Sequence, residues 1–523
     1  MSATTIPAVL ARAARDRGDD PAIVDGDVRL GCAALADAVT AAARALAALG
    51  VGPGDAVAIW APNSWRWIVA ALATHARGAV LVPINTRYKG DEAAFVLARS
   101  RARVLFTVDG FLGARYVAML RATEAAPRLD ATVILGGDVP AGATAWADFV
   151  AGGARADAAA VARDAAAVGP DDVCDLMFTS GTTGAPKGVP CRHGQTTRAF
   201  ADWGDLVGLR RGDRYLVVAP FFHSFGYKAG WLASLQAGAV VLPQPTFDVD
   251  AVLARIARDR ITVLPGPPTL YLSLLAHPGR GDVDLSSLRL AVTGAASVPV
   301  ELVHRMRRDL GFATVLTGYG LTESTGVATL CRAGDDDETV ATTSGRAMPG
   351  VEVAVVDDAG APVAAGAAGE VVIRGYNVMR GYLDDADATA AAIDRDGWLR
   401  TGDVGVLDDR GYLRITDRKK DMFIVGGFNA YPAEIEGVLL RHPAIAQVAV
   451  VGAPDPRLGE IGVAFVIPRA GATIDAAALT AWSRDHMANF KVPRRFVAVD
   501  ALPLNATGKV LKFELRRRAA ELP

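Results

Sequence analysis

The strongest constraint on the fold is an alternation of short apolar runs with longer amphipathic stretches. After Asp55 the apolar runs cover residues 56–60, 80–84 and 104–108, and the stretches between them cover residues 64–77 and 91–100. Short apolar runs of this kind are typical of buried strands, and amphipathic stretches of this length are typical of helices. Because strands separated by helices favour a parallel arrangement, the sequence predicts α/β layers.

A second alternating series, which begins at the Gly-rich stretch 179–188, predicts a second α/β subdomain. Its strands are expected at residues 214–219, 240–242, 262–264, 290–293 and 314–316. The Ala-rich segments 41–48 and 158–167 are predicted to be helices, because Ala is the strongest helix former. A chain of 523 residues also exceeds what one hydrophobic core organises, which favours several structural units.

The pattern changes after Gly345. Short runs broken by Gly and Asp continue to Tyr412 and predict a small antiparallel β unit. The charged cluster 417–421 then precedes a segment with its own α and β pattern, as a hinge between domains would. We therefore predict a large N-terminal domain at residues 1–419, made of two α/β subdomains and the β unit, and a smaller, mobile α+β domain at residues 420–523.

The most chemically specific stretch is residues 179–188, Thr-Ser-Gly-Thr-Thr-Gly-Ala-Pro-Lys-Gly. The apolar run before it predicts a buried strand ending in a Gly-rich turn, where backbone N–H groups can converge on phosphate oxygens. It is not a Walker A loop, because Pro186 replaces the Gly before the lysine and Gly188 replaces the Ser or Thr that holds Mg²⁺. We expect it to bind a triphosphate through Thr179, Ser180, Gly181, Thr182, Thr183, Gly184 and Lys187.

Composition excludes several classes of function. The chain has 55 basic and 57 acidic residues, which argues against nucleic acid as a partner. The four cysteines are too scattered for a C-x-x-C pair or a zinc site, which fits a reduced cytoplasm. No apolar run reaches the length of a membrane span, and the N-terminus lacks the apolar core of a signal peptide. We expect a cytoplasmic protein without an integral membrane segment; its oligomeric state is left open, with a homodimer among the alternatives.

The loop at residues 179–188 resembles the signature loop of the adenylate-forming enzymes, which include acyl-CoA synthetases, luciferases and the adenylation domains of peptide synthetases. Residues 317–323, Thr-Gly-Tyr-Gly-Leu-Thr-Glu, are similar to the family's YGxTE signature. A dinucleotide fingerprint would need Gly or Ala where Glu323 stands. The resemblance implies that Gly318, Tyr319 and Gly320 lie along adenine, that Thr322 meets the α-phosphate, and that Glu323 and Thr179 bind Mg²⁺.

Other motifs follow in the family's order. Gly294, Ala295 and Ala296 resemble the adenine-side wall, and Asp403 in Thr-Gly-Asp resembles the residue that binds both ribose hydroxyls. The resemblance further implies that His223 lines the acyl pocket, that Arg418 contacts the nucleotide and that Lys420 is the pivot of the C-terminal domain. It also implies that Gly426 and Gly427 border the pantetheine tunnel and that Lys509, in Asn-Ala-Thr-Gly-Lys, is the catalytic lysine.

These motifs imply an ATP-dependent acyl-CoA synthetase that uses ATP, Mg²⁺ and CoA. The acid would become acyl-AMP with release of pyrophosphate, and CoA would then displace AMP. An amino-acid adenylation enzyme would be expected to carry an acidic residue at 222–225 and a carrier domain, and neither is present. A non-catalytic nucleotide-binding module would be expected to lack Lys509 or Glu323. A luciferase-like activity stays open from the motifs alone.

Within the family, the passages Phe-Phe-His-Ser-Phe-Gly-Tyr-Lys-Ala-Gly and Gly-Gly-Phe-Asn-Ala-Tyr-Pro-Ala-Glu-Ile-Glu resemble bacterial CoA ligases that act on propanoate side chains of degraded steroid rings. Medium- or long-chain fatty acids and aryl acids remain alternative substrates. Lys228 is either a cation beside the acyl pocket or a solvent-directed helix residue. Five aromatic side chains at residues 221–231 favour a wide apolar pocket for fused rings; they are Phe221, Phe222, Phe225, Tyr227 and Trp231.

Overall fold

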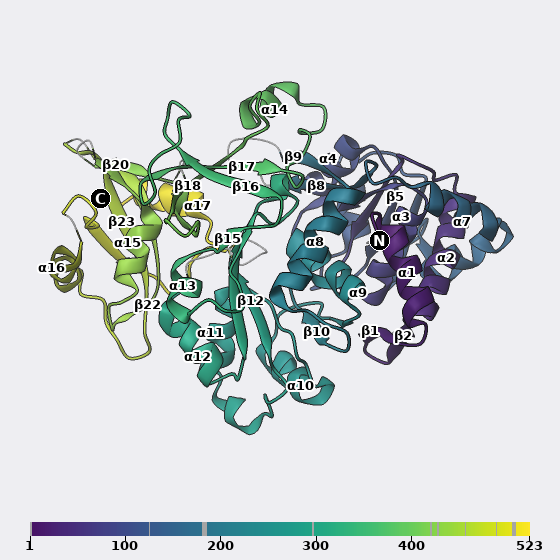
Figure 1. Cartoon of the computed structure of the whole chain (residues 1–523), viewed down its shortest axis with the longest axis horizontal. Coiled ribbons are helices and arrows are strands. Elements are labelled where there is room, and N and C mark those ends of the chain that lie inside the picture. Colours follow the sequence, from purple (N-terminus) through teal and green to yellow (C-terminus); the bar gives the residue numbers. More distant parts are fainter. Residues whose placement is uncertain are drawn as a thin grey trace.

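The computed structural model describes residues 3–124, 126–179, 186–294, 298–418, 421–425, 428–455, 457–487, 489–504 and 509–522. Two α/β sheets form most of the larger domain (Figure 1). The first sheet has the order β7-β6-β5-β3-β4-β8-β9, and β9 alone runs antiparallel to its neighbour. Its strands are β3 (Ala56–Trp60), β4 (Val80–Pro83), β5 (Ala102–Val108), β6 (Ala131–Gly136), β7 (Thr144–Ala145), β8 (Val173–Thr179) and β9 (Lys187–Arg192).

Local sequence explains these elements well. All residues of β3 are buried, as expected for a central strand covered on both faces. The next helix, α3 (Trp65–Ala76), begins at Ser64, whose Oγ accepts a hydrogen bond from the Trp67 N–H at 3.2 Å. The predicted strand 56–60 and helix 158–167 are confirmed residue for residue.

The second sheet draws strands from distant parts of the chain. Strand β10 (Arg214–Val217) pairs in parallel with β11 (Val240–Pro243), β11 pairs in parallel with β1 (Pro21–Asp25), and β2 (Val28–Gly31) forms the edge. On the other side of β10, Val263 bridges Tyr215 to Leu290 and so joins β12 (Leu290–Gly294) and β13 (Thr314–Tyr319). Beyond β13 lie the short strands β14 (Thr329–Leu330) and β15 (Arg346–Ala347).

Two expectations about this sheet need correction. The predicted strand 262–264 is reduced to a single bridging residue, Val263. The second series was also expected to begin at the phosphate-binding loop, but β8 and β9 belong to the first sheet, whereas the N-terminal β1 and β2 complete the second. Because pairing between parallel strands depends on long crossover connections, neighbours in a sheet need not be neighbours in the chain.

Helices cover both sheets. In the larger domain they are α1 (Ile6–Arg17), α2 (Cys32–Ala48), α4 (Gly90–Ser100), α5 (Tyr116–Arg121), α6 (Trp146–Gly152), α7 (Ala158–Ala167), α8 (His193–Val207), α9 (Ala233–Ala237), α10 (Val249–Asp259), α11 (Pro268–Ala276), α12 (Val300–Arg308), α13 (Asp337–Thr342) and α14 (Ala386–Ala392).

The predicted antiparallel β unit is present. It consists of β16 (Val351–Val356), β17 (Ala368–Gly375), β18 (Leu399–Leu407) and β19 (Leu413–Arg418), paired in that order. The smaller domain follows, at the left of Figure 1, with cores separate from the main one. It contains β20 (Phe423–Val425), β21 (Phe428–Ala430), β22 (Ile445–Asp455), β23 (Gly459–Pro468), β24 (Arg495–Ala498), α15 (Pro432–Leu439), α16 (Ala476–His486) and α17 (Lys512–Ala520).

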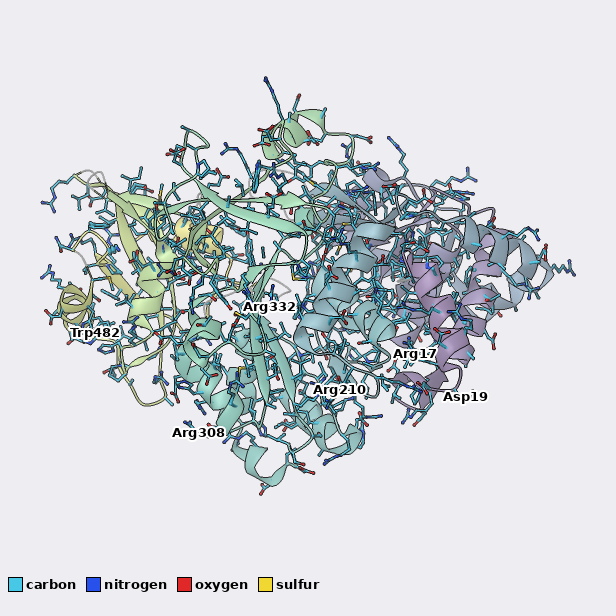
Figure 2. The ribbon with its side chains drawn as sticks, viewed as in Figure 1. Arg17, Asp19, Arg210, Arg308, Arg332 and Trp482 are labelled. Carbon is cyan, nitrogen blue, oxygen red and sulfur yellow. The ribbon has the colours of Figure 1, made fainter. Side chains whose placement is uncertain are left out.

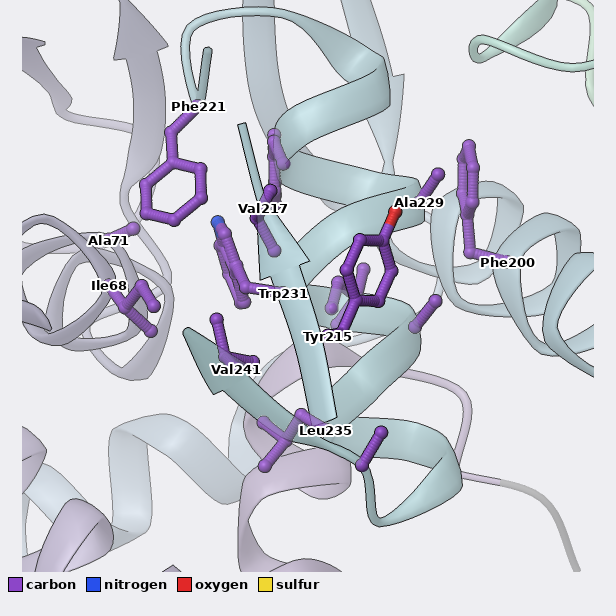
Figure 3. Close-up of a cluster of buried hydrophobic side chains, with 14 of the residues drawn as sticks. Ile68, Ala71, Phe200, Tyr215, Val217, Phe221, Ala229, Trp231, Leu235 and Val241 are labelled. Atoms are coloured by element: carbon purple, nitrogen blue, oxygen red, sulfur yellow. The ribbon is translucent and has the colours of Figure 1, made fainter. Parts of the chain in front are cut away.

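Three of the five aromatic side chains expected to line a substrate pocket belong to the core instead. Phe221 and Tyr227 have no exposed area and Trp231 retains 1%. All three rings pack around Trp67, with centroid distances of 5.3, 6.2 and 6.3 Å. Figure 3 shows Phe221 and Trp231 among Ile68, Val217 and Val241. Only Phe222 and Phe225, which are half-buried, remain available to a substrate.

The surface carries charged groups of both signs, and the cysteines lie in the interior. Figure 2 labels Arg17 on α1, Arg210 in the loop before β10 and Arg308 on α12, with oxygen and nitrogen atoms mixed around the outline. All four cysteines are buried and free. Within the described ranges, no helix is both long enough and apolar enough to span a bilayer.

Candidate active site

The predicted triphosphate-binding loop connects β8 and β9. These strands form an antiparallel hairpin in which Thr179 pairs with Lys187, and the Thr179 Oγ1 donates to the Lys187 carbonyl oxygen at 3.4 Å. The loop therefore begins at the carboxyl end of a parallel strand, because β8 runs parallel to β4. This edge of an open α/β sheet is where ligands bind. Residues 180–185, and with them Ser180, Gly181, Thr182, Thr183 and Gly184, lie outside the described residues.

The predicted adenine and ribose residues are in contact. Tyr319, at the end of β13, donates its hydroxyl hydrogen to Asp403 Oδ2 at 2.6 Å. Asp403 lies in β18, so this bond joins the second sheet to the β unit. Arg418 pairs with Asp403 across β18 and β19, which brings its backbone to the same place. This arrangement suits a nucleoside, because an aromatic ring can lie against the base and a carboxylate can accept hydrogen bonds from the ribose hydroxyls.

The glycines of this region allow close backbone packing. A Cβ on Gly320 would lie 2.5 Å from Val327 Cα, and one on Gly294 would lie 2.8 Å from the Gly318 carbonyl oxygen. Gly294 and Gly318 are register partners in β12 and β13. Ala295 and Ala296, the rest of the predicted adenine-side wall, lie outside the described residues.

Glu323 has the surroundings of a ligand for a hard cation. It lies with Thr322 on a short 3₁₀ turn, Thr322–Ser324, and both side chains are half-buried. Among the described residues no Lys, Arg or His forms an ion pair with Glu323, and no group of three metal-ligating side chains exists. Mg²⁺ commonly uses one or two carboxylates plus phosphate oxygens rather than an all-protein cage. The donor set therefore fits Mg²⁺ bound together with a nucleotide.

Tyr382 contacts Glu323 and was not predicted. Its hydroxyl donates to Glu323 Oε1 at 3.0 Å, and burial followed by the nearby Glu323 charge raises the pKa of Tyr382. The hydroxyl therefore stays protonated and able to donate. Nothing in the sequence signals this contact, because Tyr382 lies far along the chain from Glu323 and in no motif that we identified.

His223 and Lys509 lie within electrostatic reach of each other. Burial, with a contribution from the Lys509 charge, lowers the pKa of His223 to about 4. By its solvent-accessible area, however, His223 is an exposed residue, so a substrate can reach it. His223 is therefore neutral at pH 7. Lys509 follows residues 505–508, which lie outside the described residues, and a bridge between Leu504 and Val510 closes that segment.

Lys228 occupies neither of its two predicted positions. It is fully buried, and its Nζ lies 3.2 Å from Asp175 Oδ1, which is also fully buried. Lys228 belongs to a π-helix, Phe225–Leu232, that directly follows the His223 segment, whereas Asp175 lies in β8. The ion pair thus ties the His223 segment to the strand that leads into the phosphate loop.

The remaining predicted residues cannot be placed. Lys420, Gly426 and Gly427 lie outside the described residues. Their proposed roles as pivot and as border of the pantetheine tunnel stay predictions.

Comparisons with known proteins bear on the family of this chain. Residues 10–383 match the family model described as "AMP-binding enzyme", and residues 434–509 match "AMP-binding enzyme C-terminal domain". A 3-[(3aS,4S,7aS)-7a-methyl-1,5-dioxo-octahydro-1H-inden-4-yl]propanoyl:CoA ligase of Mycobacterium tuberculosis is 54% identical over 98% of both chains. The ligase of the same name from Rhodococcus jostii is 50% identical, also over 98% of both chains.

Solved structures show the same fold. An anthranilate CoA ligase in complex with anthranoyl-AMP superposes with a TM-score of 0.88 at 30% identity, over 98% of this chain and 97% of that one. ATP-bound MatB from Rhodopseudomonas palustris superposes with a TM-score of 0.87 at 30% identity, over 99% of both chains.

Proposed function

Because the chain belongs to the AMP-binding enzyme family and is an AMP-forming acid–thiol ligase with ATP and CoA as substrates, we propose that its acid is a bicyclic keto-propanoate of steroid origin. The observation that carries the proposal is the 54% and 50% identity, over nearly the whole chain, to two ligases named for an indane-dione propanoate. Feruloyl-CoA synthase of Amycolatopsis sp is less similar, at 40% identity. An aryl or fatty acid is therefore the second candidate.

The described residues divide the first half-reaction between them. The substrate carboxylate attacks the α-phosphorus, a P–O bond forms, and the bond to the pyrophosphate oxygen breaks. Both reactants are anionic, so positive charge must be held where negative charge develops. We assign this role to Lys509 and to the phosphate loop, including Lys187. Asp403 and Tyr319 hold the nucleoside, and His223 stays neutral beside the acid, so its ring adds no charge that would compete with Lys509 for the carboxylate.

Glu323 and Thr179 would hold Mg²⁺, which would supply positive charge at the phosphate oxygens. The hard carboxylate of Glu323, without a protein cation as partner among the described residues, supports this assignment. The Thr322 hydroxyl, next to Glu323, would donate to the α-phosphate.

In the second half-reaction the CoA thiol loses its proton to solvent, the thiolate attacks the acyl carbon, and AMP leaves with the bonding electron pair. We propose that the domain at residues 420–523 turns about Lys420, which withdraws Lys509 and brings Gly426 and Gly427 to the acyl-AMP, with Arg418 on the nucleotide. A cytoplasmic location, where CoA and ATP are available, belongs to the same proposal.

The substrate assignment predicts a higher kcat/KM for a 7a-methyl-1,5-dioxo-octahydroinden-4-yl propanoate than for octanoate, palmitate or ferulate. One methylene alone is worth only about 1–3 kcal/mol in a hydrophobic pocket, so a decisive preference needs the ring system itself to be recognised. The measurement is CoA-dependent AMP release with each acid at saturating ATP, Mg²⁺ and CoA. A value for palmitate or ferulate equal to or above that of the ring acid would reject the ring-acid assignment and leave the CoA-ligase activity standing.

The metal assignment predicts that Glu323→Gln raises the Mg²⁺ concentration needed for half-maximal acyl-AMP formation. The amide keeps the size of the side chain but removes the charge that a hard cation prefers. Glu352→Gln is the matched control, because Glu352 is a surface carboxylate whose Oε2 pairs with Arg374 at 2.8 Å. An unchanged Mg²⁺ titration for Glu323→Gln would place the metal elsewhere.

A further inference from the structure

We propose that Tyr382 is a positioning residue, which orients Glu323 toward its metal and Lys187 toward the triphosphate. Tyr382 lies in the segment at residues 376–383, which we call the strap and which holds it in place. The strap lies between β17 and α14 and contains none of the motifs described above. This inference rests on the proposed Mg²⁺ site at Glu323.

The strap is attached at one end to the motif that contains Glu323. The Met379 N–H donates to the Glu323 carbonyl oxygen at 2.8 Å. Asn377 is fully buried; its Nδ2 donates to the Val327 carbonyl oxygen at 2.8 Å, and its own carbonyl oxygen accepts from Thr325 Oγ1 at 2.6 Å. These bonds fix the strap to the turn that presents the carboxylate.

At its other end the strap is attached to the hairpin that carries the phosphate loop. The Leu383 N–H donates to the Gly188 carbonyl oxygen at 2.9 Å, one residue after Lys187. A Cβ on Gly188 would lie 3.2 Å from Leu383 Cβ, so the two chains are closely packed there. The strap therefore joins the two parts of the nucleotide site, which otherwise belong to different sheets.

Tyr382 lies between these two attachments and contacts a functional group on each side. Its hydroxyl donates to Glu323 Oε1 at 3.0 Å, and the Lys187 Nζ lies 4.8 Å from the centroid of its ring. Neither contact cancels a charge: the hydroxyl occupies one carboxylate oxygen and the ring face attracts the ammonium. A direct Lys–Glu ion pair would instead satisfy each group with the other, away from phosphate and metal. Carboxylates that bind metals are commonly oriented by hydrogen bonds of this kind.

The test measures ATP binding by calorimetry, with and without saturating Mg²⁺, on the full-length protein in the absence of acid and CoA. The ratio of the two affinities reports how well the site uses the metal. Tyr382→Phe keeps the ring under Lys187 and removes the hydroxyl, and we expect the ratio to fall by about 10–100-fold, the usual effect of losing an outer-shell partner of a metal ligand. Tyr382→Leu should in addition weaken ATP binding without Mg²⁺, because the face that holds Lys187 is lost.

Tyr376→Phe is the matched control on the same strap. Tyr376 donates to Asp202 Oδ2 at 3.2 Å and has the Arg198 guanidinium 3.9 Å from its ring centroid, so it makes the same two kinds of contact away from the nucleotide motifs. We expect it to leave the ratio unchanged. The unliganded melting temperature is measured for every variant, and Tyr382→Phe and Tyr376→Phe should lower it to a similar extent.

Glu323→Gln in the same assay separates this inference from the metal assignment. If Glu323→Gln lowers the ratio and Tyr382→Phe does not, Tyr382 does not position the ligand and the inference is wrong. If Tyr376→Phe and Tyr382→Phe lower the affinity ratio equally, Tyr382 has no special role within the strap. That result would also overturn the inference. If Glu323→Gln leaves the ratio unchanged, the metal site at Glu323 fails and the inference fails with it.

Discussion

Lys509→Ala is expected to slow acyl-AMP formation on the order of 10²–10³-fold, the usual cost of losing one preorganised contact to developing charge. The structure supports this because Lys509 lies close enough to His223 for its charge to lower the pKa of that ring. His223 follows β10, whose sheet also provides Tyr319 through β13. A residue of the smaller domain thus reaches the site on the larger one.

The second half-reaction should be nearly unaffected by Lys509→Ala, because the proposed rotation of the smaller domain has already withdrawn Lys509 from the site before CoA attacks. The measurements are acid-dependent pyrophosphate exchange for the first step and thioester formation from supplied acyl-AMP for the second. Lys512→Ala is the matched control, since Lys512 Nζ is held 2.9 Å from Glu436 within the smaller domain. Equal losses in both steps would refute the assignment of Lys509 to adenylation alone.

A spectroscopic readout accompanies this variant. The two causes that lower the pKa of His223 are burial and then the Lys509 charge. Removing the charge should raise the pKa of His223 from about 4 toward its ordinary value, while burial keeps it below that value. The shift is followed by the NMR resonances of the His223 ring during an acid titration. An unmoved pKa would mean that Lys509 is not close to the ring in solution.

Lys228→Met is expected to lower the free energy of unfolding by about 3–5 kcal/mol, the cost of leaving the partner of a buried ion pair unpaired. Lys228 and Asp175 have no exposed side-chain area, and the Cys174 thiol donates to Asp175 Oδ2 at 3.1 Å. Burial alone would lower the pKa of Lys228, but the attraction of the Asp175 carboxylate outweighs it and raises that pKa. The lysine is therefore charged, and Met would leave Asp175 as an isolated buried carboxylate.

The double variant Lys228→Met/Asp175→Asn should recover most of this loss, because it leaves no buried charge. The measurement is denaturant unfolding followed by tryptophan fluorescence, since Trp231 stacks on Tyr227, the residue before Lys228, with centroids 4.9 Å apart. A single variant as stable as the wild type, or a double variant no more stable than the single one, would show that the pair does not act as a buried ion pair.

Short-range patterns in the sequence determined the helices and strands named below and the motifs. The run 56–60 and the Ala-rich stretch 158–167 became β3 and α7 with unchanged bounds, because burial on both faces and helix propensity act within a few residues. The order of motifs from Thr179 to Lys509 likewise indicated an adenylate-forming enzyme, since each motif is a contiguous set of groups that must meet one part of the nucleotide.

Only the tertiary structure decided which distant groups meet. The sequence could not show that β1 joins the second sheet, that Lys228 faces Asp175 or that Tyr382 reaches Glu323, because the partners are separated by long stretches of chain and bear no shared pattern. The aromatic residues at 221–231 illustrate the same limit: local composition made them apolar, but packing around Trp67 placed three of them in the core. Hydrophobic periodicity predicts which face of an element is apolar, but it does not predict which distant element will cover that face.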